Sequence, residues 1–161
     1  MQDTMLLRPK TTGRFNSLME LYEHNYMLIR LLAPGLRQYR HKAYVSRPNE
    51  LLPLELSVIE HNRFTTTFKL TYLFSSGSRH DREPNLTIRL YHDARTCEVM
   101  SGLIPSERAE SRRTRDLDNG YHLNRFLNKW VSYCLRQGHG FATPERPKAE
   151  HQSEARLTAL Q

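Results

Sequence analysis

The sequence has little of the material from which the common catalytic and metal motifs are built. It contains seven glycines in 161 residues, and none of them belongs to a P-loop, a G-x-G-x-x-G turn or a G-x-S-x-G elbow. The eight histidines are scattered, without the H-x-x-x-H or Cys/His spacing of a metal site. We therefore predict no catalytic set, no metal site and no cofactor from sequence motifs.

Cysteine is scarce, and long apolar runs are missing. Cys97 and Cys134 do not form a C-x-x-C pair, and both fall on predicted core faces, so we expect them to be reduced and structural. No stretch approaches the roughly 18 apolar residues that a membrane span needs. The first ten residues also lack the charged, apolar and small-residue order of a signal peptide. These absences favour a cytoplasmic domain without a membrane partner.

Acidic residues are outnumbered by basic ones. The chain has 24 Lys and Arg against 17 Asp and Glu, a formal net charge of +7. Residues 138–161 hold three of each sign, so the positive excess lies in the earlier part of the chain. A basic protein of this size binds nucleic acid non-specifically at low salt. Charge alone is therefore weak support for a nucleic-acid function.

A helix is predicted near each end of the chain. The first begins with a capping box formed by Ser17 and Glu20, and it ends at Pro34-Gly35. The second begins at Asp118 or Asn119 and ends at Gly138. Its apolar stripe consists of Leu123, Phe126, Leu127, Trp130, Val131, Cys134 and Leu135. Polar residues, Asn124 among them, are expected on its opposite face.

Five segments between the helices are predicted strands: 39–46, 53–60, 63–75, 86–92 and 95–101. In the second, Leu54, Leu56 and Val58 alternate with Glu55, Ser57 and Ile59. In the third, Phe64, Thr66, Phe68, Leu70, Tyr72 and Phe74 alternate with Thr65, Thr67, Lys69 and Thr71. Such strict alternation is typical of a sheet with one covered face.

The last two strands are predicted to form a hairpin about Asp93-Ala94. Pairing outward from this turn sets Tyr91 opposite Thr96, Leu90 opposite Cys97, Arg89 opposite Glu98 and Ile88 opposite Val99. This register places the apolar residues on one face and an Arg–Glu pair, worth about 0.2–1 kcal/mol, on the other. Because Asp-Ala is poor for a two-residue type I′ turn, we expect a four-residue loop.

These elements predict a single α+β domain over residues 16–138. It consists of an antiparallel sheet of about five strands, packed on one face by the N-terminal and the C-terminal helix. Residues 1–15 are expected to be a flexible N-terminus and residues 139–161 a disordered tail. The other sheet face would be uncovered and polar.

Four separated segments carry a family resemblance. They are Asn25 to Pro34, read as N-x-x-x-I-R-L-L-x-P; R-F-T-T at 63–66; I-R-L-Y-H-D-A at 88–94 followed by Glu98-Val99; and the closing helix over 123–138. In this order they resemble the YqiB-like family of small gammaproteobacterial proteins of unknown function. The resemblance runs from about residue 16 to 138 and implies no catalytic residues. Genes of this family often lie beside those for an ADP-ribose pyrophosphatase and a cyclic-AMP phosphodiesterase, which associates the family with nucleotide metabolism or regulation.

Seven residues are candidate ligand-binding residues: Arg63, Lys69, Arg89, Tyr91, His92, Asp93 and Glu98. Basic groups on the uncovered sheet face would suit a phosphate or an acidic partner segment. His92 and Asp93 could do acid–base work, but neighbouring strand residues point to opposite faces, and Asp is ordinary in a turn. Arg89 and Glu98 could equally form a surface ion pair of little energetic weight. The arginines within 108–115 alternate with acidic residues, which favours a solvated connector.

These features favour a non-enzymatic binding or regulatory module. It would use the polar, basic sheet face or a sheet edge to bind a protein partner or an acidic, phosphate-bearing ligand. One alternative is an enzyme acting on a nucleotide-like phosphate compound, based on Arg89, His92 and Asp93. A second alternative is RNA or DNA binding, although no RNP-like motif is present and only Tyr91 could stack a base on the uncovered face.

Overall fold

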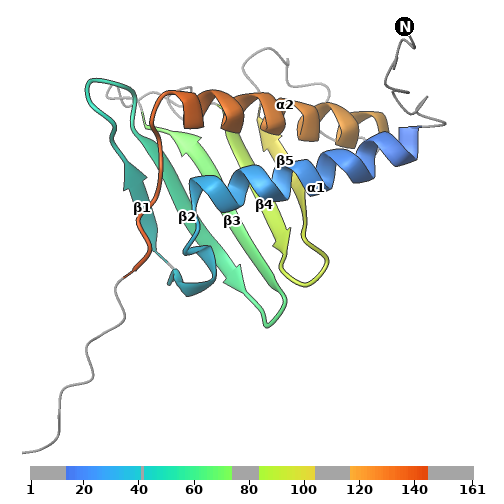
Figure 1. Ribbon diagram of the computed structural model, residues 1–161, viewed down its shortest axis with the longest axis horizontal. Helices are drawn as coiled ribbons and strands as arrows, with labels where there is room; N and C mark the ends of the chain where they lie inside the picture. Colours follow the sequence, from blue (N-terminus) through green and yellow to red (C-terminus); the bar gives the residue numbers. More distant parts are fainter. Residues whose placement is uncertain (1–13, 41, 74–83, 104–116, 145–161) are drawn as a thin grey trace, which may run out of the picture.

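The computed structural model describes residues 14–40, 42–73, 84–103 and 117–144. Its elements are α1 (Arg14–Leu32), the 3-10 turn η1 (Leu36–Gln38), β1 (Ala43–Ser46), β2 (Leu54–His61), β3 (Thr65–Tyr72), β4 (Asn85–Tyr91), β5 (Thr96–Leu103) and α2 (Leu117–Arg136). The two helices lie side by side over one face of a five-stranded sheet (Figure 1). The predicted α+β fold is confirmed. Neither helix, over its described residues, is long and apolar enough to cross a membrane.

The sheet is an antiparallel meander in the order β1-β2-β3-β4-β5. In a meander, successive turns alternate between the two ends of the sheet. The β2–β3 turn and the β4–β5 turn therefore lie at the same end, and η1 lies close to that end (Figure 1). This arrangement brings together three short segments that are far apart in the sequence.

The β4–β5 hairpin has the predicted register. Arg89 pairs with Glu98, and the neighbouring pairs follow in the expected order. The loop has four residues, 92–95, and Arg95 at its end has a φ of +53°, in the left-handed region. His92 is the first loop residue, and its N–H donates to the carbonyl of Phe64 at 2.8 Å. This hydrogen bond ties the β4–β5 turn to the β2–β3 turn.

A β-bulge near the end of β2 changes which sheet face its last residues occupy. Ile59 has no partner on β3, although the residues on both sides of it are paired. After the bulge, His61 pairs with Thr66 and therefore lies on the helix-covered face. Uninterrupted alternation from Leu54 would have placed His61 on the uncovered face, because one extra residue reverses every later side chain.

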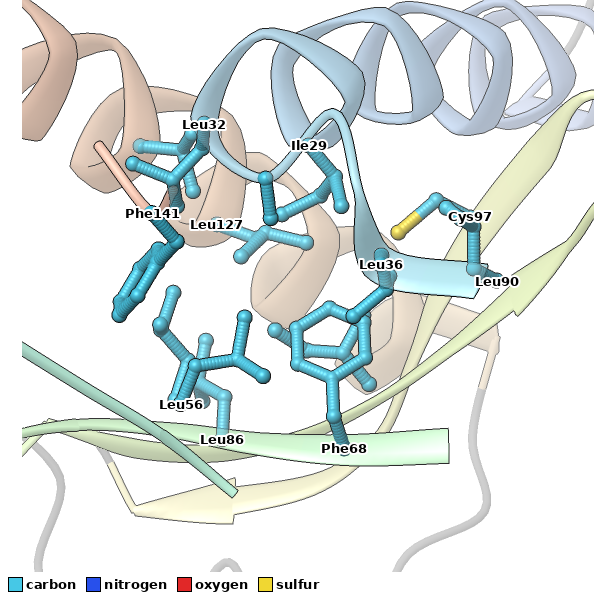
Figure 2. Packing of buried hydrophobic residues seen from close by; sticks show 14 of the residues in the cluster. Ile29, Leu32, Leu36, Leu56, Phe68, Leu86, Leu90, Cys97, Leu127 and Phe141 are labelled. Carbon is cyan, nitrogen blue, oxygen red and sulfur yellow. The ribbon is translucent and has the colours of Figure 1, made fainter. Parts of the chain in front are cut away.

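The core lies between the sheet and the two helices. Figure 2 shows Phe68 and Leu86 of the sheet pointing toward Leu127 of α2, and all three are buried. Cys97 and Cys134 are also buried in this core and are free thiols, as predicted. Burial raises the pKa of both thiols, so they remain protonated and unreactive.

Three sequence-based predictions about single residues are wrong. The first helix begins at Arg14, so Ser17 lies one turn inside it and is not its N-cap. Phe64, expected to face inward, is 49% exposed because it lies in the turn before β3. Asn124, expected on the exposed face of α2, is buried because its Oδ1 accepts the N–H of Val99 on β5 at 3.0 Å.

The predicted first strand, 39–46, is a strand only in its second half. Its first half follows η1 and is fixed by Tyr39. The Tyr39 ring stacks on Tyr44 with 4.1 Å between centroids, and its hydroxyl donates to the carbonyl of Ala142 at 2.8 Å. Burial raises the pKa of Tyr39 to about 12, so the hydroxyl stays a donor. Side-chain packing therefore sets the backbone here rather than strand pairing.

The chain remains packed beyond Gly138, the expected end of the domain. Gly138 has a φ of +88° and ends α2 as predicted, with the N–H of His139 donating to the carbonyl of Cys134 at 3.0 Å in a Schellman motif. Phe141 is buried, and its N–H donates to the carbonyl of Leu32 at 2.8 Å. The first six residues of the expected tail therefore belong to the packed structure.

Several expectations fall on residues that the structure does not describe. They are the flexibility of residues 1–13, the inward position of Phe74, the solvated connector within 104–116 and the disorder of residues 145–161. They remain predictions.

Candidate functional site

A cavity of about 470 Å³ opens at the end of the sheet where η1 meets the two turns. Six residues line it: Arg37, His61, Asn62, Arg63, Thr66 and His92. They come from η1, the last residue of β2, the β2–β3 turn, β3 and the β4–β5 turn. The volume lies in the range of roughly 300–1,000 Å³ that is typical of small-molecule sites. The meander and the β2 bulge together build this cavity.

A chain of hydrogen bonds joins two histidines of the cavity through one threonine. The fully buried Thr66 hydroxyl lies 2.7 Å from His92 Nε2 and 3.1 Å from His61 Nδ1. The other ring nitrogen of His61, Nε2, is hydrogen bonded to the carbonyl of Tyr39. Both histidines are half-buried, so the chain leads from the cavity into the protein.

The partners of this chain fix the direction of its hydrogens. Because a carbonyl oxygen only accepts, His61 Nε2 carries a hydrogen and donates it to Tyr39. In the neutral His61 ring, Nδ1 then accepts the hydroxyl hydrogen of Thr66. The Thr66 oxygen in turn accepts the Nε2–H of His92. Among the described residues, these hydrogen bonds use both ring nitrogens of His61 and Nε2 of His92. His92 Nδ1 therefore remains available to a ligand or to solvent.

Arginine side chains gather around the cavity. Arg37 lines it, and its Nη2 donates to the carbonyl of Arg63 at 3.5 Å. The guanidinium of Arg63 lies over the ring of Phe64, 5.1 Å from its centroid. Arg30, at the end of α1, donates from Nη1 to the carbonyl of Pro34 at 2.9 Å. The positive charges thus come from three different elements.

These surroundings keep His92 uncharged. Burial contributes most, followed by electrostatic interactions with Arg37, His61 and Arg30, and together they lower the pKa of His92 to about 4. The carboxylate of Asp93 acts in the opposite direction but is outweighed. Near neutral pH the ring is therefore neutral, and the cavity offers a base beside fixed positive charge.

The chemistry of the lining suits an anion. None of the six lining residues is acidic. Arginine forms bidentate, charge-assisted hydrogen bonds with phosphate and carboxylate groups. Throughout the described ranges, no group of three or more His, Cys, Asp or Glu gathers in a way that could hold a metal ion.

The structure divides the seven predicted ligand-binding residues between two places. Arg63 and His92 line the cavity. Asp93 is exposed in the turn beside His92, where it acts on that ring only through its charge. The other four are Lys69, Arg89, Tyr91 and Glu98, and they lie on the sheet face that the helices leave uncovered.

On that uncovered face, most of the predicted residues bond to one another or to neighbours. Arg89 Nε donates to Thr67 Oγ1 at 3.1 Å, and the Tyr91 hydroxyl donates to Glu98 Oε1 at 2.5 Å. Tyr22 of α1 also hydrogen-bonds Glu98. Burial first, and then Glu98, raises the pKa of both tyrosines, so both hydroxyls stay donors. The Glu98 carboxylate is thus engaged within the protein.

Sequence reasoning missed four cavity residues: Arg37, His61, Asn62 and Thr66. The meander was the available signal, because it predicts that the turns containing Arg63 and His92 meet at one end of the sheet. No sequence pattern revealed the bulge that turns His61 toward Thr66. Arg37 was assigned to the connection between helix and sheet, with no predicted neighbour.

Sequence comparison gives this chain its family. A family model described as a protein of unknown function, DUF1249, matches residues 27–140, which include every cavity residue. The chain belongs to the DUF1249 family. The resemblance expected from the sequence motifs is confirmed, since the chain is 29% identical to the uncharacterized protein YqiB of Escherichia coli K12 over 137 residues, covering 79% of this chain and 92% of YqiB. The YqiB proteins of strains O6:H1 and O157:H7 match to the same extent. No solved structure matches this DUF1249 protein.

Proposed function

We propose that this DUF1249 protein is a binding module for a small acidic ligand that carries a phosphate or a similar oxyanion. The ligand would occupy the cavity between η1 and the two turns. The observation that carries the proposal is that Arg37 and Arg63 line a cavity without any acidic lining residue, beside a neutral His92. Both guanidinium groups are exposed, and a bound anion would form charge-assisted hydrogen bonds with them.

Phe64 supports a ligand that also contains a planar ring. Its side chain is exposed, and it stands directly beside Arg63 at the cavity. Aromatic rings and guanidinium planes both stack on nucleobases, at about 1–3 kcal/mol per base. A nucleotide-like phosphate compound would use the arginines and this ring together.

The uncovered sheet face supports the proposal less than the cavity does. Arg89, Tyr91 and Glu98 already have partners within the protein. RNA or DNA binding has only the net charge of +7 in its favour. The free, buried cysteines support the cytoplasmic location that we propose.

An enzyme acting on a phosphate compound is the second candidate. It is favoured by His92, a neutral ring at the cavity whose Nδ1 could take a proton. The test is hydrolysis of p-nitrophenyl phosphate by the wild-type protein and the His92→Gln variant. The binding-module proposal expects equal, background rates from both. A wild-type rate that His92→Gln abolishes would favour the enzyme instead.

Calorimetric titration with inorganic phosphate tests the binding proposal, at about 150 mM salt to screen generic attraction. We expect saturable binding that weakens by about tenfold or more in Arg37→Gln and in Arg63→Gln, because each loses a charge-assisted hydrogen bond worth about 1.5–3 kcal/mol. Lys69→Gln is the matched control, since it removes the same charge from the uncovered face. An absence of saturable binding, or an equal loss in Lys69→Gln, would contradict the proposal.

A further inference from the structure

The hydrogen-bonded chain through Thr66 can accept a proton without losing a bond. In the neutral arrangement its three hydrogens sit on His92 Nε2, on the Thr66 oxygen and on His61 Nε2. A proton that binds His92 Nδ1 lets the Nε2 hydrogen pass to the Thr66 oxygen. The Thr66 hydrogen then passes to His61 Nδ1.

The transfer is balanced. One proton enters, only N–H and O–H bonds form and break, and one positive charge arrives on His61. Both nitrogens of that ring then donate, Nε2 to the Tyr39 carbonyl and Nδ1 to the Thr66 oxygen. The Thr66 hydroxyl now donates to His92 Nε2. Every hydrogen bond is kept and two of them reverse direction, so the charge can settle on His61, the second histidine of the cavity.

The charged groups around the His92–Thr66–His61 hydrogen bonds determine whether a proton is taken up. Arg30 on α1, Arg37 on η1 and Arg63 in the β2–β3 turn are positive, and Asp93 in the β4–β5 turn is negative. In the empty cavity the arginines oppose an added proton. A bound dianion offsets their charge and attracts the proton instead.

We propose that the cavity binds a tetrahedral dianion, of the phosphate-ester or sulfate type, together with one proton that the His92–Thr66–His61 chain stores. This inference rests on the proposed function and specifies its ligand class. A dianion is preferred over a singly charged carboxylate because its two negative charges can interact with both Arg37 and Arg63 and also balance the added proton. Ligand binding is consequently stronger at acidic pH.

Sulfate is the suitable probe, because it stays a dianion across the pH range in which histidine titrates. The full chain is titrated calorimetrically near pH 5.5 and near pH 7.5, in two buffers of different ionisation enthalpy. We expect binding to be about five- to tenfold tighter at the lower pH, with uptake of up to one proton, as linkage requires when the proton is held more tightly in the complex.

Variants identify the groups that hold the proton. Thr66→Val keeps the branched shape and removes only the hydroxyl, while His92→Gln removes the entry point. In both variants the affinity ratio between the two pH values should fall to within about twofold, since linked proton uptake is lost. His122→Gln, on the exposed face of α2, is the control and should keep the wild-type ratio.

A measurement on the wild-type protein avoids the question of whether Thr66→Val, a substitution at a buried position, folds correctly. The imidazole signals of His92 and His61 are titrated by NMR with and without sulfate. The proposal requires sulfate to raise the titration midpoint of one of these rings to about 6 or above, because only then does binding tighten five- to tenfold, roughly, between pH 7.5 and pH 5.5. Unchanged midpoints would overturn it.

The outcomes separate the two proposals. Sulfate that fails to bind at any pH overturns both the anion site and the stored proton. Sulfate binding that depends on Arg37 but gives equal heats in the two buffers overturns the stored proton alone. Proton uptake that survives in Thr66→Val and in His92→Gln also overturns it.

Discussion

At the scale of single residues, two buried asparagines join the helices to the sheet. Asn25 and Asn124 are each only 1% exposed. Asn25 Nδ2 donates to the carbonyl of Asn124 at 3.0 Å, and Asn124 Nδ2 donates to the carbonyl of Gly120 at 2.7 Å. Asn124 Oδ1 accepts the N–H of Val99, and Asn25 Oδ1 accepts from Asn128, both at 3.0 Å. All the polar atoms of these two amides are satisfied, and the Val99 N–H of the edge strand β5 has a partner.

Replacing Asn124 with alanine should lower the free energy of unfolding by about 1–3 kcal/mol. The substitution leaves the buried Val99 N–H without its partner, and a buried unsatisfied group costs roughly 1–3 kcal/mol. The bond from Asn25 to the backbone carbonyl of Asn124 is kept. Urea denaturation monitored by circular dichroism measures the loss. Arg125→Ala is the control, because Arg125 is exposed and should change stability by no more than about 0.5 kcal/mol. Equal stabilities for the two variants would contradict this role for Asn124.

At the scale of elements, the segment after α2 closes the end of the fold. Phe141 and Thr143 lie against the end of α1 and the residues before η1, where Gly35 comes close to Thr143. A Cβ at Gly35 would stand 2.8 Å from Thr143 Cα, which real structures do not allow. Gly35 is therefore required for this close approach, in addition to following the end of α1.

Replacing Gly35 with alanine should destabilise the protein by about 1–3 kcal/mol, the usual cost of overpacking. The extra methyl group must push the C-terminal segment away from η1. Gly140→Ala is the matched control, because a Cβ there meets nothing within 4 Å. The midpoint of thermal unfolding, measured for both variants, compares their stabilities. A Gly35→Ala protein as stable as Gly140→Ala would show that the segment is not held at this contact.

Phe141→Ala tests the same segment through its core contact. A buried Phe→Ala change costs about 3–5 kcal/mol. Ala142→Ser, at the exposed neighbouring position, should leave stability within about 0.5 kcal/mol of the wild-type value. Urea denaturation gives both numbers. Little loss in Phe141→Ala would restore the domain boundary at Gly138 that the sequence suggested.

Whether a segment forms a helix or a strand was predictable where its hydrophobic pattern agreed with its place in the fold. Period-two alternation predicted β3, and the apolar stripe predicted α2, because one face of each is covered. The β4–β5 register followed from placing apolar pairs on one face. The ends of elements were predicted less well, as the start of α1 and the first half of 39–46 show. In those places distant packing, such as that of Tyr39 against Tyr44, decides the backbone.

At the scale of the whole molecule, stability should fall as pH drops from about 6.5 toward 4. Burial lowers the pKa of His92 to about 4 and also lowers that of His139, below the ordinary value near 6.5. In this pH window the two histidines are protonated in the unfolded protein but remain neutral in the native protein, so acidification favours unfolding. Urea midpoints at the two ends of the window measure the effect.

His92→Gln should show a smaller loss of stability over the same window, because only one of the two histidines then binds a proton on unfolding. His122→Gln, at an exposed position, should lose as much as the wild-type protein. A His92→Gln protein with an unchanged pH dependence would mean that the native state accepts the proton at this ring.

The candidate site was predictable only in part, because it is a property of the whole molecule. Arg63 and His92 stood out by residue type, and the meander could have placed their turns together. The remaining cavity residues depend on the bulge at Ile59 and on the position of η1. Neither has a local sequence signature. The polar sheet face was identified from alternation alone, which reveals exposure but not whether Glu98 already has partners.

The most direct test of the central claim is a map of amide chemical-shift changes in the labelled protein as inorganic phosphate is added. An anion site in the cavity predicts the largest changes at Arg37, at residues 61–66 and at residues 92–93, all saturating with one affinity. Residues 67–71 and 85–89 of the uncovered face should stay close to their starting positions. Changes centred on Lys69 and Arg89, or spread over all basic residues without saturation, would contradict the claim.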